Sequence, residues 1–530
     1  MVAFLVYMFK KSLLERLIDY YGISLEEYES LNKEVTFDMI PSYRNFERID
    51  DAVNLVKKHI SLQSKAIIYG DYDVDGISGT SILYKALKEA GLEAAFYIPS
   101  RYIDGYGINV KRAQDIVSKG YQFVICVDNG VSANEAIEIL KNNNIEVLVI
   151  DHHNWGEKLP DADVIIHPEL SHYSKTNSSA GFTSFMFSVA LLGRFDQYLA
   201  TLAAISIVTD SMPLVDYNRD FVRLMTSLYK KDQYPAIELL LDYEDFNYSS
   251  IGMKIGPKLN SIGRVIKEPL GNRAVRFLTS DNAEDISKYY VWINEINDQR
   301  KQMSQELKLE ANLVPVTDDD IIVAKMDVVE GLLGNAALEL MNRFNKPAIV
   351  FTVDSLDEEV LKGSGRSLNN FSLSDAFTAL DELIITHGGH SGAAGITIRA
   401  DKLEEFRTAI NEYAKTRGVE KVEKKAVPFS INEINAESLK LIESFSPFGQ
   451  EWPEPRLEIK RVKVEELKYT KNDSMVRTPI SRISTLVGFN IPKEKLSGYS
   501  YIDLYGSLKA NTYFSKDGVD FHISDYEKSK

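Results

Sequence analysis

The sequence predicts a multidomain α/β protein whose first folded region is built on a parallel sheet. Three observations lead to this fold class: the length of 530 residues, a series of short apolar runs that each end in an acidic residue, and a helical stretch between two of those runs. A chain of this length is too long for one core, and at roughly 150 residues per domain it should form three or four domains.

The first apolar run, residues 65–69, is predicted to be a buried strand because it is short, holds two Ile residues and is bounded by Gly70. It leads into "GDYDVDG", where Asp71, Asp73 and Asp75 alternate. Three carboxylates this close repel one another unless a cation lies among them. The sequence therefore predicts a cation site at the carboxyl end of this strand, the edge at which open α/β sheets bind ligands.

A calcium-binding EF-hand loop also begins with alternating Asp residues followed by Gly. That loop requires a bidentate Glu at its twelfth position, where this chain has Ile82. It also requires an entering helix, whereas the residues before Asp71 have the pattern of a strand. We therefore exclude the EF-hand.

Two further apolar runs resemble the first. "FVICVDNG" ends in Asp128, and "VLVIDHHN" ends in Asp151, His152 and His153. Each run has about four to six apolar residues bounded by turn formers, as expected of strands that are covered on both faces. Right-handed crossovers bring the carboxyl ends of parallel strands to one edge, so we expect these residues to meet the first acidic turn.

The stretch between these two runs, "SANEAIEILKNNN", has the spacing of a helix. We expect Ser132 to cap its N-terminus, with Glu135 as the capping-box partner three residues later. The two strands and the helix would form a β-α-β unit. A further acidic landmark, Asp210, follows a long Ala-rich run that we predict to be a helix ending at the same cleft.

Taken singly, these residues have ordinary structural explanations, because an Asp at a strand end is usually a cap or turn residue. Together they form a mixed oxygen and nitrogen donor set, which favours Mn²⁺ or Mg²⁺ over a sulfur-rich structural zinc site. Two such ions about 3.5–4 Å apart can activate a water and stabilise an in-line displacement at phosphorus. The predicted chemistry is phosphoester hydrolysis.

Composition narrows the functional classes. The chain is 44% hydrophobic and 26% charged, as globular proteins are, and its longest apolar run, around residues 199–208, is far shorter than the ~20 residues of a membrane span. We expect no membrane segment. The single cysteine, Cys126, excludes an internal disulfide and fits a reducing, cytoplasmic compartment.

The net charge of −16 is unevenly distributed. Residues 456–530 hold 14 Lys and Arg against 10 Asp and Glu, a net charge of +4, which leaves −20 for residues 1–455. An acidic body can still bind polyanions where part of its charge is a metal-ligand cluster, because bound divalent ions reverse the local field. The net charge therefore does not exclude a nucleic-acid substrate.

The motifs above resemble those of the DHH phosphoesterases and, within that superfamily, the RecJ single-strand exonucleases. "GDYDVDG", "VDNG", "DHHN" and "TDSMPL" correspond in order to four motifs of the family. Further segments similar to RecJ are "IPSRYIDGYGIN", "IGPKLNSIGR", "GSGRS", "GGHSGAAG" and "FSPFGQEWPEP". The resemblance extends from about residue 60 to residue 530.

The sequence divides into five parts, of which the resemblance implies the last four. These are an N-terminal helical segment (1–60), a DHH catalytic domain with a parallel sheet (61–280), a connecting helix (281–317), a smaller α/β DHH-associated domain (318–415) and a C-terminal oligonucleotide-binding (OB)-like β-barrel (429–530). The helical composition of the polar stretch 282–313 agrees with the connecting helix.

The resemblance also assigns roles to the acidic residues and histidines. Asp128 would bridge two ions, His153 would face the scissile phosphate, and Asp151 would orient an imidazole. The implied ligands of two Mn²⁺ or Mg²⁺ ions are Asp71, Asp73, Asp75, Asp128, His152 and Asp210. The implied catalytic residues are Asp73, Asp128, His152 and His153.

The resemblance implies that three arginines bind substrate phosphates: Arg101, Arg264 and Arg366. This role suits the bidentate geometry of a guanidinium. In "THGGHSGAAG", glycines that include Gly389 let the backbone approach an anion, and His390 can add a hydrogen bond to a phosphate. Composition alone favours a tight turn there, whereas the resemblance favours a substrate site.

Two places depart from the RecJ pattern. Val328 and Val329 stand where Trp-His is usual before the glycines of the second domain, and Lys258 stands where Arg is commoner. None of these residues is an implied metal ligand. The departures therefore affect the expected substrate contacts and not the expected hydrolysis.

The resemblance implies a metal-dependent exonuclease that releases mononucleotides from single-stranded DNA, 5′ to 3′, in DNA repair, recombination or replication. A single-strand-binding protein or a helicase would be its protein partner. The alternatives are an oligoribonuclease or cyclic-dinucleotide phosphodiesterase, a pyrophosphatase, and a non-catalytic replication scaffold. The intact ligand set disfavours the scaffold, and the basic, aromatic C-terminal segment disfavours a small-substrate enzyme.

The C-terminal segment interleaves Lys and Arg with aromatic residues. About half of these aromatic residues should form the core of a β-domain. Alternation in "YIDLYGSLKANTYF" should direct the others outward as a stacking platform for unpaired bases. The aromatic residues are Tyr469, Phe489, Tyr499, Tyr501, Tyr505, Tyr513 and Phe514.

Overall fold

The computed structural model describes residues 11–355, 357–368, 370–417, 425–471, 474–489, 491–511 and 515–529. Contacts within the chain divide it into two compact units. The larger unit holds Phe37–Met212 and Asp220–Val422, and the smaller unit holds Met1–Thr36, Pro213–Arg219 and Glu423–Lys530.

The larger unit contains a five-stranded sheet in the order β2-β1-β3-β4-β5, and all of its strand pairs are parallel. The three apolar runs of the sequence are β1, β3 and β4, and nearly all of their residues are buried. The predicted parallel α/β fold is confirmed. The strands are β1 (Ala66–Tyr69), β2 (Ala94–Tyr97), β3 (Phe123–Val127), β4 (Glu146–Ile150) and β5 (Val164–Ile166).

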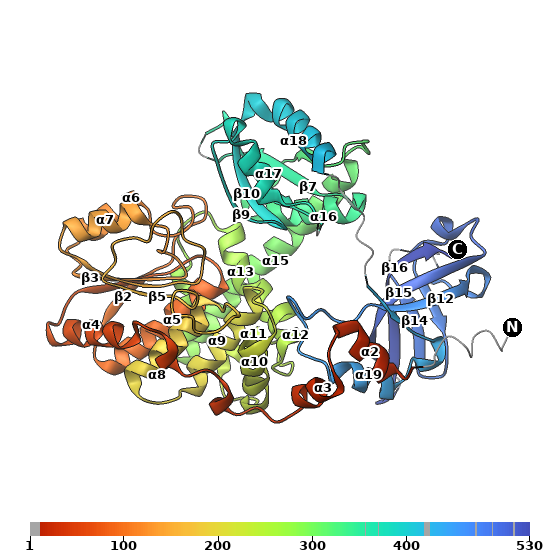
Figure 1. The fold of residues 1–530 in the computed structure, drawn as a ribbon, viewed down its shortest axis with the longest axis horizontal. Coiled ribbons are helices and arrows are strands. Elements are labelled where there is room, and N and C mark those ends of the chain that lie inside the picture. Colours follow the sequence, from red (N-terminus) through yellow and green to blue (C-terminus); the bar gives the residue numbers. More distant parts are fainter. Residues whose placement is uncertain are drawn as a thin grey trace. The chain divides into compact units, whose positions relative to one another are not determined.

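Helices cover both faces of this sheet (Figure 1). On one face, α6 (Val110–Ser118) and α7 (Asn134–Asn142) share a core with Val124 of β3. Val127 points to the opposite face, where a methyl group added to Gly79 of α5 (Val74–Ala90) would come within 2.7 Å of its side chain. The other helices of that face are α4 (Ile49–Ser61) and α8 (Ala180–Leu192).

Helix α7 begins differently from the prediction. Its N-cap is Ala133, which makes no side-chain cap, while the hydroxyl of Ser132 donates to the carbonyl of Asn154 at 3.1 Å. The predicted capping box of Ser132 and Glu135 is therefore wrong. The loop after β4 offers Ser132 an acceptor that a local sequence pattern does not reveal.

Further helices follow the sheet. The Ala-rich run forms α9 (Gln197–Thr209) with Asp210 at its C-cap, as predicted. The polar stretch forms α15 (Ala283–Leu313), a helix of 31 residues whose N-cap, Asn282, accepts hydrogen bonds from the first turn. The other helices are α10 (Asp216–Leu228), α11 (Pro235–Leu240), α12 (Tyr248–Ser250), the π-helix η3 (Ile251–Ile255), α13 (Gly256–Val265) and α14 (Asn272–Thr279).

A second sheet of the larger unit has the order β6-β7-β8-β10-β9, and only the pair β6-β7 is parallel. The "GGHSGAAG" stretch forms the hairpin of β9 and β10, in which paired residues His390 and Ala393 enclose a two-residue turn. The elements are β6 (Ile322–Lys325), α16 (Leu333–Phe344), β7 (Ala348–Val353), β8 (Val360–Arg366), α17 (Leu373–Ala379), β9 (Thr386–His390), β10 (Ala393–Arg399) and α18 (Leu403–Arg417).

The smaller unit combines a six-stranded sheet with helices from both ends of the chain. Leu13 and Leu17 of α2 are buried in the same core as Phe445, Leu504 and Phe521. The elements are α2 (Leu13–Tyr21), α3 (Leu25–Leu31), β11 (Val427–Pro428), α19 (Ala436–Glu443), β12 (Leu457–Lys463), β13 (Val476–Pro479), β14 (Ser484–Gly488), β15 (Tyr501–Ala510) and β16 (Val519–Lys528).

This arrangement differs from the single helical segment expected over residues 1–60. Residues up to Thr36 belong to the smaller unit, and Phe37 begins the larger one. Helix α2 has an apolar face that must be covered, and the core of the C-terminal sheet covers it. Among the described residues, no helix is both long and apolar enough to cross a bilayer.

The aromatic residues of the C-terminal segment divide between core and surface. Tyr505 is buried, whereas Phe489 is 58% exposed and Tyr499 is 36% exposed. Two of these rings carry a guanidinium on their face: Arg456 lies 3.9 Å from the centroid of Tyr505, and Arg461 lies 4.7 Å from that of Tyr501. Tyr513 and Phe514 lie outside the described residues.

Candidate metal centre

The acidic turn after β1 is fixed by the start of α5. Asp73 is the N-cap of this helix, and its Oδ1 accepts hydrogen bonds from the backbone N–H of Asp75 at 2.9 Å and of Gly76 at 3.2 Å. Gly76 has no room for a side chain, because a Cβ there would lie 2.4 Å from the backbone nitrogen of Asp71. The tight turn keeps the three carboxylates at the end of the strand.

The carboxylate of Asp75 is oriented by the N-terminus of α8. It accepts hydrogen bonds from the backbone N–H of Ala180 at 2.8 Å and of Gly181 at 2.7 Å, and from the hydroxyl of Ser206. These three donors leave part of its acceptor capacity unused. Its Oδ2 lies 3.5 Å from Nε2 of His152.

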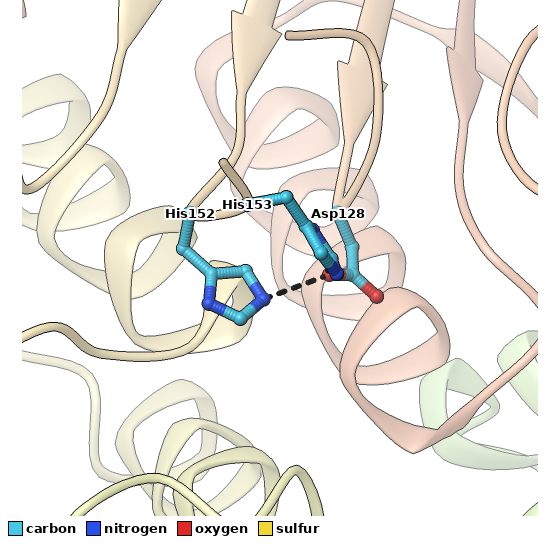
Figure 2. A group of neighbouring side chains, drawn as sticks. All are labelled: Asp128, His152 and His153. Carbon is cyan, nitrogen blue, oxygen red and sulfur yellow. Dashed lines mark ion pairs between the residues drawn. The ribbon is translucent and has the colours of Figure 1, made fainter. Parts of the chain in front are cut away.

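Asp128 follows β3 in a left-handed backbone conformation, with φ of +62°. Asn129 holds the turn, because its side-chain amide donates to the carbonyls of Tyr69, Gly70 and Val127 at 2.9–3.2 Å. The side chain of Asp128 points toward both histidines (Figure 2), and its Oδ1 lies 3.3 Å from Nε2 of His152.

His152 is the point at which the carboxylates converge. Its Nε2 lies 3.3–3.5 Å from oxygens of Asp75, Asp128 and Asp210, yet it has no hydrogen-bond partner among the described residues. The side-chain amide of Asn177 donates to its carbonyl at 2.9 Å. An imidazole nitrogen that is surrounded by carboxylate oxygens and bonded to none of them fits a site in which all of them bind a cation.

Asp151 has a different environment from the other carboxylates. It accepts hydrogen bonds from the backbone N–H of Val131, His152 and His153 and, at 2.9 Å, from Nδ1 of His153. Burial alone would raise the pKa of Asp151, but the hydrogen bond and the charge of His153 hold it below its usual range. Asp151 therefore orients the imidazole of His153.

Burial dominates the pKa values of four of the other carboxylates. Burial, reinforced by the neighbouring carboxylates, raises the pKa values of Asp71, Asp128 and Asp210 well above the usual range, and it raises the pKa of Asp75 to about 6. One oxygen each of Asp71, Asp128 and Asp210 lacks a hydrogen-bond partner among the described residues. Such atoms are costly to bury, and a bound cation would remove that cost.

The donor atoms form three overlapping groups, each with all of its atoms within 4.8 Å of one another. Asp128 belongs to two of the groups, and so does His152. The arrangement therefore suits two adjacent ions better than one. Carboxylate oxygens with one imidazole nitrogen are ligands for Mn²⁺ or Mg²⁺, and the residues present fit these ions. The groups are Asp71, Asp73 and Asp128; Asp75, His152 and Asp210; and Asp128, His152 and His153.

The three predicted arginines lie together beside this centre. Arg101, Arg264 and Arg366 line one cavity of about 440 Å³, together with Gly388 and Gly395 of the hairpin. The guanidinium of Arg101 lies 4.3 Å from the ring centroid of Tyr72, the residue between Asp71 and Asp73, so the cavity adjoins the carboxylates. Gly389 and His390 are absent from the described lining residues, so their predicted role stays a prediction.

Tyr106 and Asn129 contact the metal centre, although their sequence motifs predict no role for them. The hydroxyl of Tyr106 lies 3.0 Å from the carbonyl of Asp128 and 2.9 Å from Nδ1 of His153. Asn129 ties β3 to β1, as described above. Both lie within motifs that the sequence singled out, "GYGIN" and "VDNG", but a role that depends on contacts between strands has no local signal.

We expect metal-free wild-type protein to lose stability relative to an Asp128→Asn variant as the pH rises above about 4. Raised carboxylate pKa values mean that the folded chain binds more protons than the unfolded chain above a pH of about 4, so linkage lowers the free energy of unfolding as the pH increases. Thermal unfolding of both proteins in a chelator measures this difference.

The comparison with the variant isolates the carboxylates. His152, whose pKa burial lowers to about 3, acts in the opposite direction below a pH of about 6.5, but both proteins contain it. The same dependence of melting temperature on pH in the two proteins would show that Asp128 is not a strained carboxylate.

Three family descriptions match successive parts of the chain. "DHH family, N-terminal domain" matches residues 65–207, "DHHA1 domain" matches residues 318–416, and "RecJ OB domain" matches residues 426–525. The single-stranded-DNA-specific exonuclease RecJ of Haemophilus influenzae is 30% identical over 77% of this chain and 76% of its own length. This chain belongs to the RecJ family. The predicted family is thereby confirmed.

The RecJ of Bacillus subtilis is also 30% identical, over 90% of this chain, and the chain spans 63% of the length of that relative. The RecJ fold is shared throughout the chain: a crystal structure of RecJ from Thermus thermophilus in complex with Mn²⁺ has a TM-score of 0.81 at 20% identity, covering 98% of this chain and 76% of that one. The predicted order of a DHH domain, a DHH-associated domain and an OB domain is confirmed.

Proposed function

We propose that this RecJ-family protein is a metal-dependent exonuclease that hydrolyses single-stranded DNA from the 5′ end and releases mononucleotides. The observation that carries the proposal is a cluster of buried carboxylates around His152 next to a cavity lined by three arginines. Cation ligands and phosphate-binding guanidiniums side by side are what phosphodiester hydrolysis requires. The names of the relatives support single-stranded DNA as the substrate.

Two Mn²⁺ or Mg²⁺ ions are part of the proposal. When bound, they would supply an activated water and neutralise charge on the phosphodiester during in-line displacement. The residues that would hold them are Asp71, Asp73, Asp75, Asp128, His152 and Asp210, of which Asp128 belongs to two of the donor groups. Mn²⁺ is also the ion in the structure of the Thermus relative.

The other residues would bind and orient the substrate. Nδ1 of His153 is engaged by Asp151 and Tyr106, which leaves Nε2 as the ring nitrogen that can donate to a phosphate oxygen. Burial lowers the pKa of His153, but the hydrogen bond and charge of Asp151 outweigh it and raise the pKa overall, which favours the protonated donor. The arginines would hold flanking phosphates.

The wider biological setting is also a proposal. Roles in DNA repair, recombination or replication, a single-strand-binding protein or a helicase as partner, and a cytoplasmic location follow from the family and not from any contact in the structure. The chain spans 63% of the length of the Bacillus relative. The full activity of that longer protein is therefore a proposal for this chain.

The test uses single- and double-stranded DNA and RNA labelled at either the 5′ or the 3′ end, with Mn²⁺ or Mg²⁺. We expect release of mononucleotides from single-stranded DNA, beginning at the 5′ end. Degradation confined to RNA or to dinucleotides would favour the oligoribonuclease or cyclic-dinucleotide alternative, and the absence of hydrolysis in either metal would favour a scaffold.

The OB domain should contribute affinity for long strands. We expect Phe489→Ala and Arg461→Ala each to weaken binding of a long single strand by about 5- to 100-fold, since a stacked base contributes roughly 1–3 kcal/mol. Cleavage of substrates a few nucleotides long should stay unchanged. Fluorescence anisotropy with long and short oligonucleotides measures the difference.

These point variants are preferable to removal of residues 429–530, because Leu13 and Leu17 share the core of that domain and would lose their cover. Arg407→Ala serves as a control, since Arg407 lies outside the OB domain and pairs with Asp319. Unchanged affinity for long strands in both test variants would remove the stacking platform from the proposal.

A further inference from the structure

A second, smaller cavity lies beside the metal centre, on a different set of elements from the one already described. Its volume is about 310 Å³, and it is lined by the C-terminus of α9, the π-helix η3, α13 and α15. Thr209 and Ser211 line it, so it adjoins the carboxylate ligand Asp210 that stands between them.

Two glycines form one wall of the cavity. A Cβ on Gly256 would lie 3.0 Å from Cγ2 of Thr209, and a Cβ on Gly252 would approach Val208 at 3.9 Å. Both glycines belong to the region where the backbone changes from the π-helix η3 to α13. Helix irregularities of this kind are frequent at functional sites, and here the glycines let the irregular segment approach the C-terminus of α9 closely.

Two arginines also line the cavity, Arg300 of α15 and Arg264 of α13. Among the described residues neither arginine has a carboxylate partner; Arg300 donates to the side chain of Asn297 at 3.1 Å, and Arg264 donates to that of Asn335 at 3.2 Å. By contrast, the next residue of α15, Lys301, forms an ion pair with Asp298 at 2.9 Å.

Arg264 belongs to both cavities, since it also lines the 440 Å³ cavity with Arg101 and Arg366. Burial, together with the charges of Arg101 and Arg300, lowers the pKa of Arg264 to about 10. A buried guanidinium that has two cationic neighbours is stabilised when an anion binds to it. Its position would let it contact one phosphate in each cavity.

We propose that the cavity between α9, η3, α13 and α15 is a separate phosphate-binding subsite, in which Arg300 and the shared Arg264 hold a phosphate of the single strand beyond those held by Arg101 and Arg366. The inference rests on the proposed exonuclease function. Guanidiniums bind phosphate in bidentate geometry, and the two that line this cavity have no carboxylate partner among the described residues.

The test compares Arg300→Gln with Lys301→Gln, which removes the same charge one residue along the same helix. Binding of single strands of two to ten nucleotides is measured by fluorescence anisotropy in a chelator, and hydrolysis of the same strands is measured in Mn²⁺. Arg300→Lys, which keeps the charge but not the fork, is the conservative variant.

We expect Arg300→Gln to weaken binding about tenfold once the strand is long enough to reach the subsite, and to leave the shortest substrate unaffected. The slope of log affinity against log salt should fall by about 0.7, as for the loss of one phosphate contact on a single strand. Lys301→Gln should behave as wild type, and Arg300→Lys should lie between the two.

A neutral methylphosphonate placed at each linkage in turn sharpens the test. One position should weaken binding to the wild type but not to Arg300→Gln, because the lost phosphate and the lost guanidinium are partners. If no position shows this coupling, or if Arg300→Gln matches Lys301→Gln at every length, the subsite does not exist. If Arg300→Gln alters only inhibition by inorganic phosphate, the cavity binds a free anion, and the proposal for the strand is overturned.

These outcomes are separable from failure of the proposed function. Wild-type protein that fails to hydrolyse any single strand in Mn²⁺ would contradict the exonuclease proposal, whatever the variants do. Wild-type protein that hydrolyses DNA while Arg300→Gln remains unchanged would contradict only the subsite.

Discussion

Replacement of Asp128 by Asn is expected to lower hydrolysis of single-stranded DNA by at least about 10³-fold at saturating Mn²⁺, because a metal centre contributes several kcal/mol to transition-state stabilisation. Asp128 belongs to two of the three ligand groups and would touch both ions. Its replacement should also abolish the rise in melting temperature that Mn²⁺ produces in the wild type, since a bound ligand stabilises only the folded state.

Asn is the appropriate substitution at this position. The backbone of residue 128 has φ of +62°, a conformation that Asn tolerates and that Ala adopts at a cost. The metal-free variant should be as stable as the wild type or more so, because one of the crowded, buried carboxylates is gone. Near-normal turnover at saturating metal in a folded variant would refute the two-ion assignment.

Replacement of Arg366 by Ala is expected to lower kcat/KM for single-stranded DNA by about 10- to 100-fold without loss of the metal ions, since hydrogen bonds to charged groups contribute about 1.5–3 kcal/mol. Arg366 lies at the end of β8, where it donates to Ser364 and to the carbonyl of Gly365. It has no carboxylate partner among the described residues, so its charge is available to a phosphate.

Arg399→Ala is the matched control, because Arg399 lies in the same sheet, is exposed and pairs with Asp401. Arg366→Lys separates charge from the bidentate fork. Calorimetric titration with Mn²⁺ on Arg366→Ala and on His390→Ala tests the division of roles. A variant that loses a metal site would place its residue among the ligands, and unchanged kcat/KM in Arg366→Ala would remove it from the substrate site.

Much of the site was predictable because its signals are local. Asp71, Asp73 and Asp75 follow a short apolar strand, and the same pattern recurs at Asp128 and His152. Parallel strands with right-handed crossovers must bring these ends to one edge, so the convergence seen in the structure follows from period and connection alone. The roles of these residues as ligands remain proposals.

Other features were not predictable, because they depend on segments that are distant in the sequence. Ser132 bonds to Asn154 and so does not cap α7, and α2 shares the core of the C-terminal sheet more than 400 residues away along the chain. A helix propensity or a capping pattern depends only on residues that are close in the sequence. These two contacts depend on tertiary packing, which brings distant segments together.

The sequence by itself determined which chemistry is present: a parallel sheet with carboxylates and imidazoles at strand ends, arginines in glycine-rich motifs, and a basic C-terminal domain. Only the tertiary structure decided which role is open to each group. Asp151 and His152 are adjacent, yet the oxygens of Asp151 are filled by N–H donors while Nε2 of His152 stays unbonded among three carboxylates. The burial of a side chain and the number of hydrogen-bond donors around it depend on elements that meet only in the folded protein. Burial and hydrogen bonding together determine whether the side chain is charged and whether it can bind a cation.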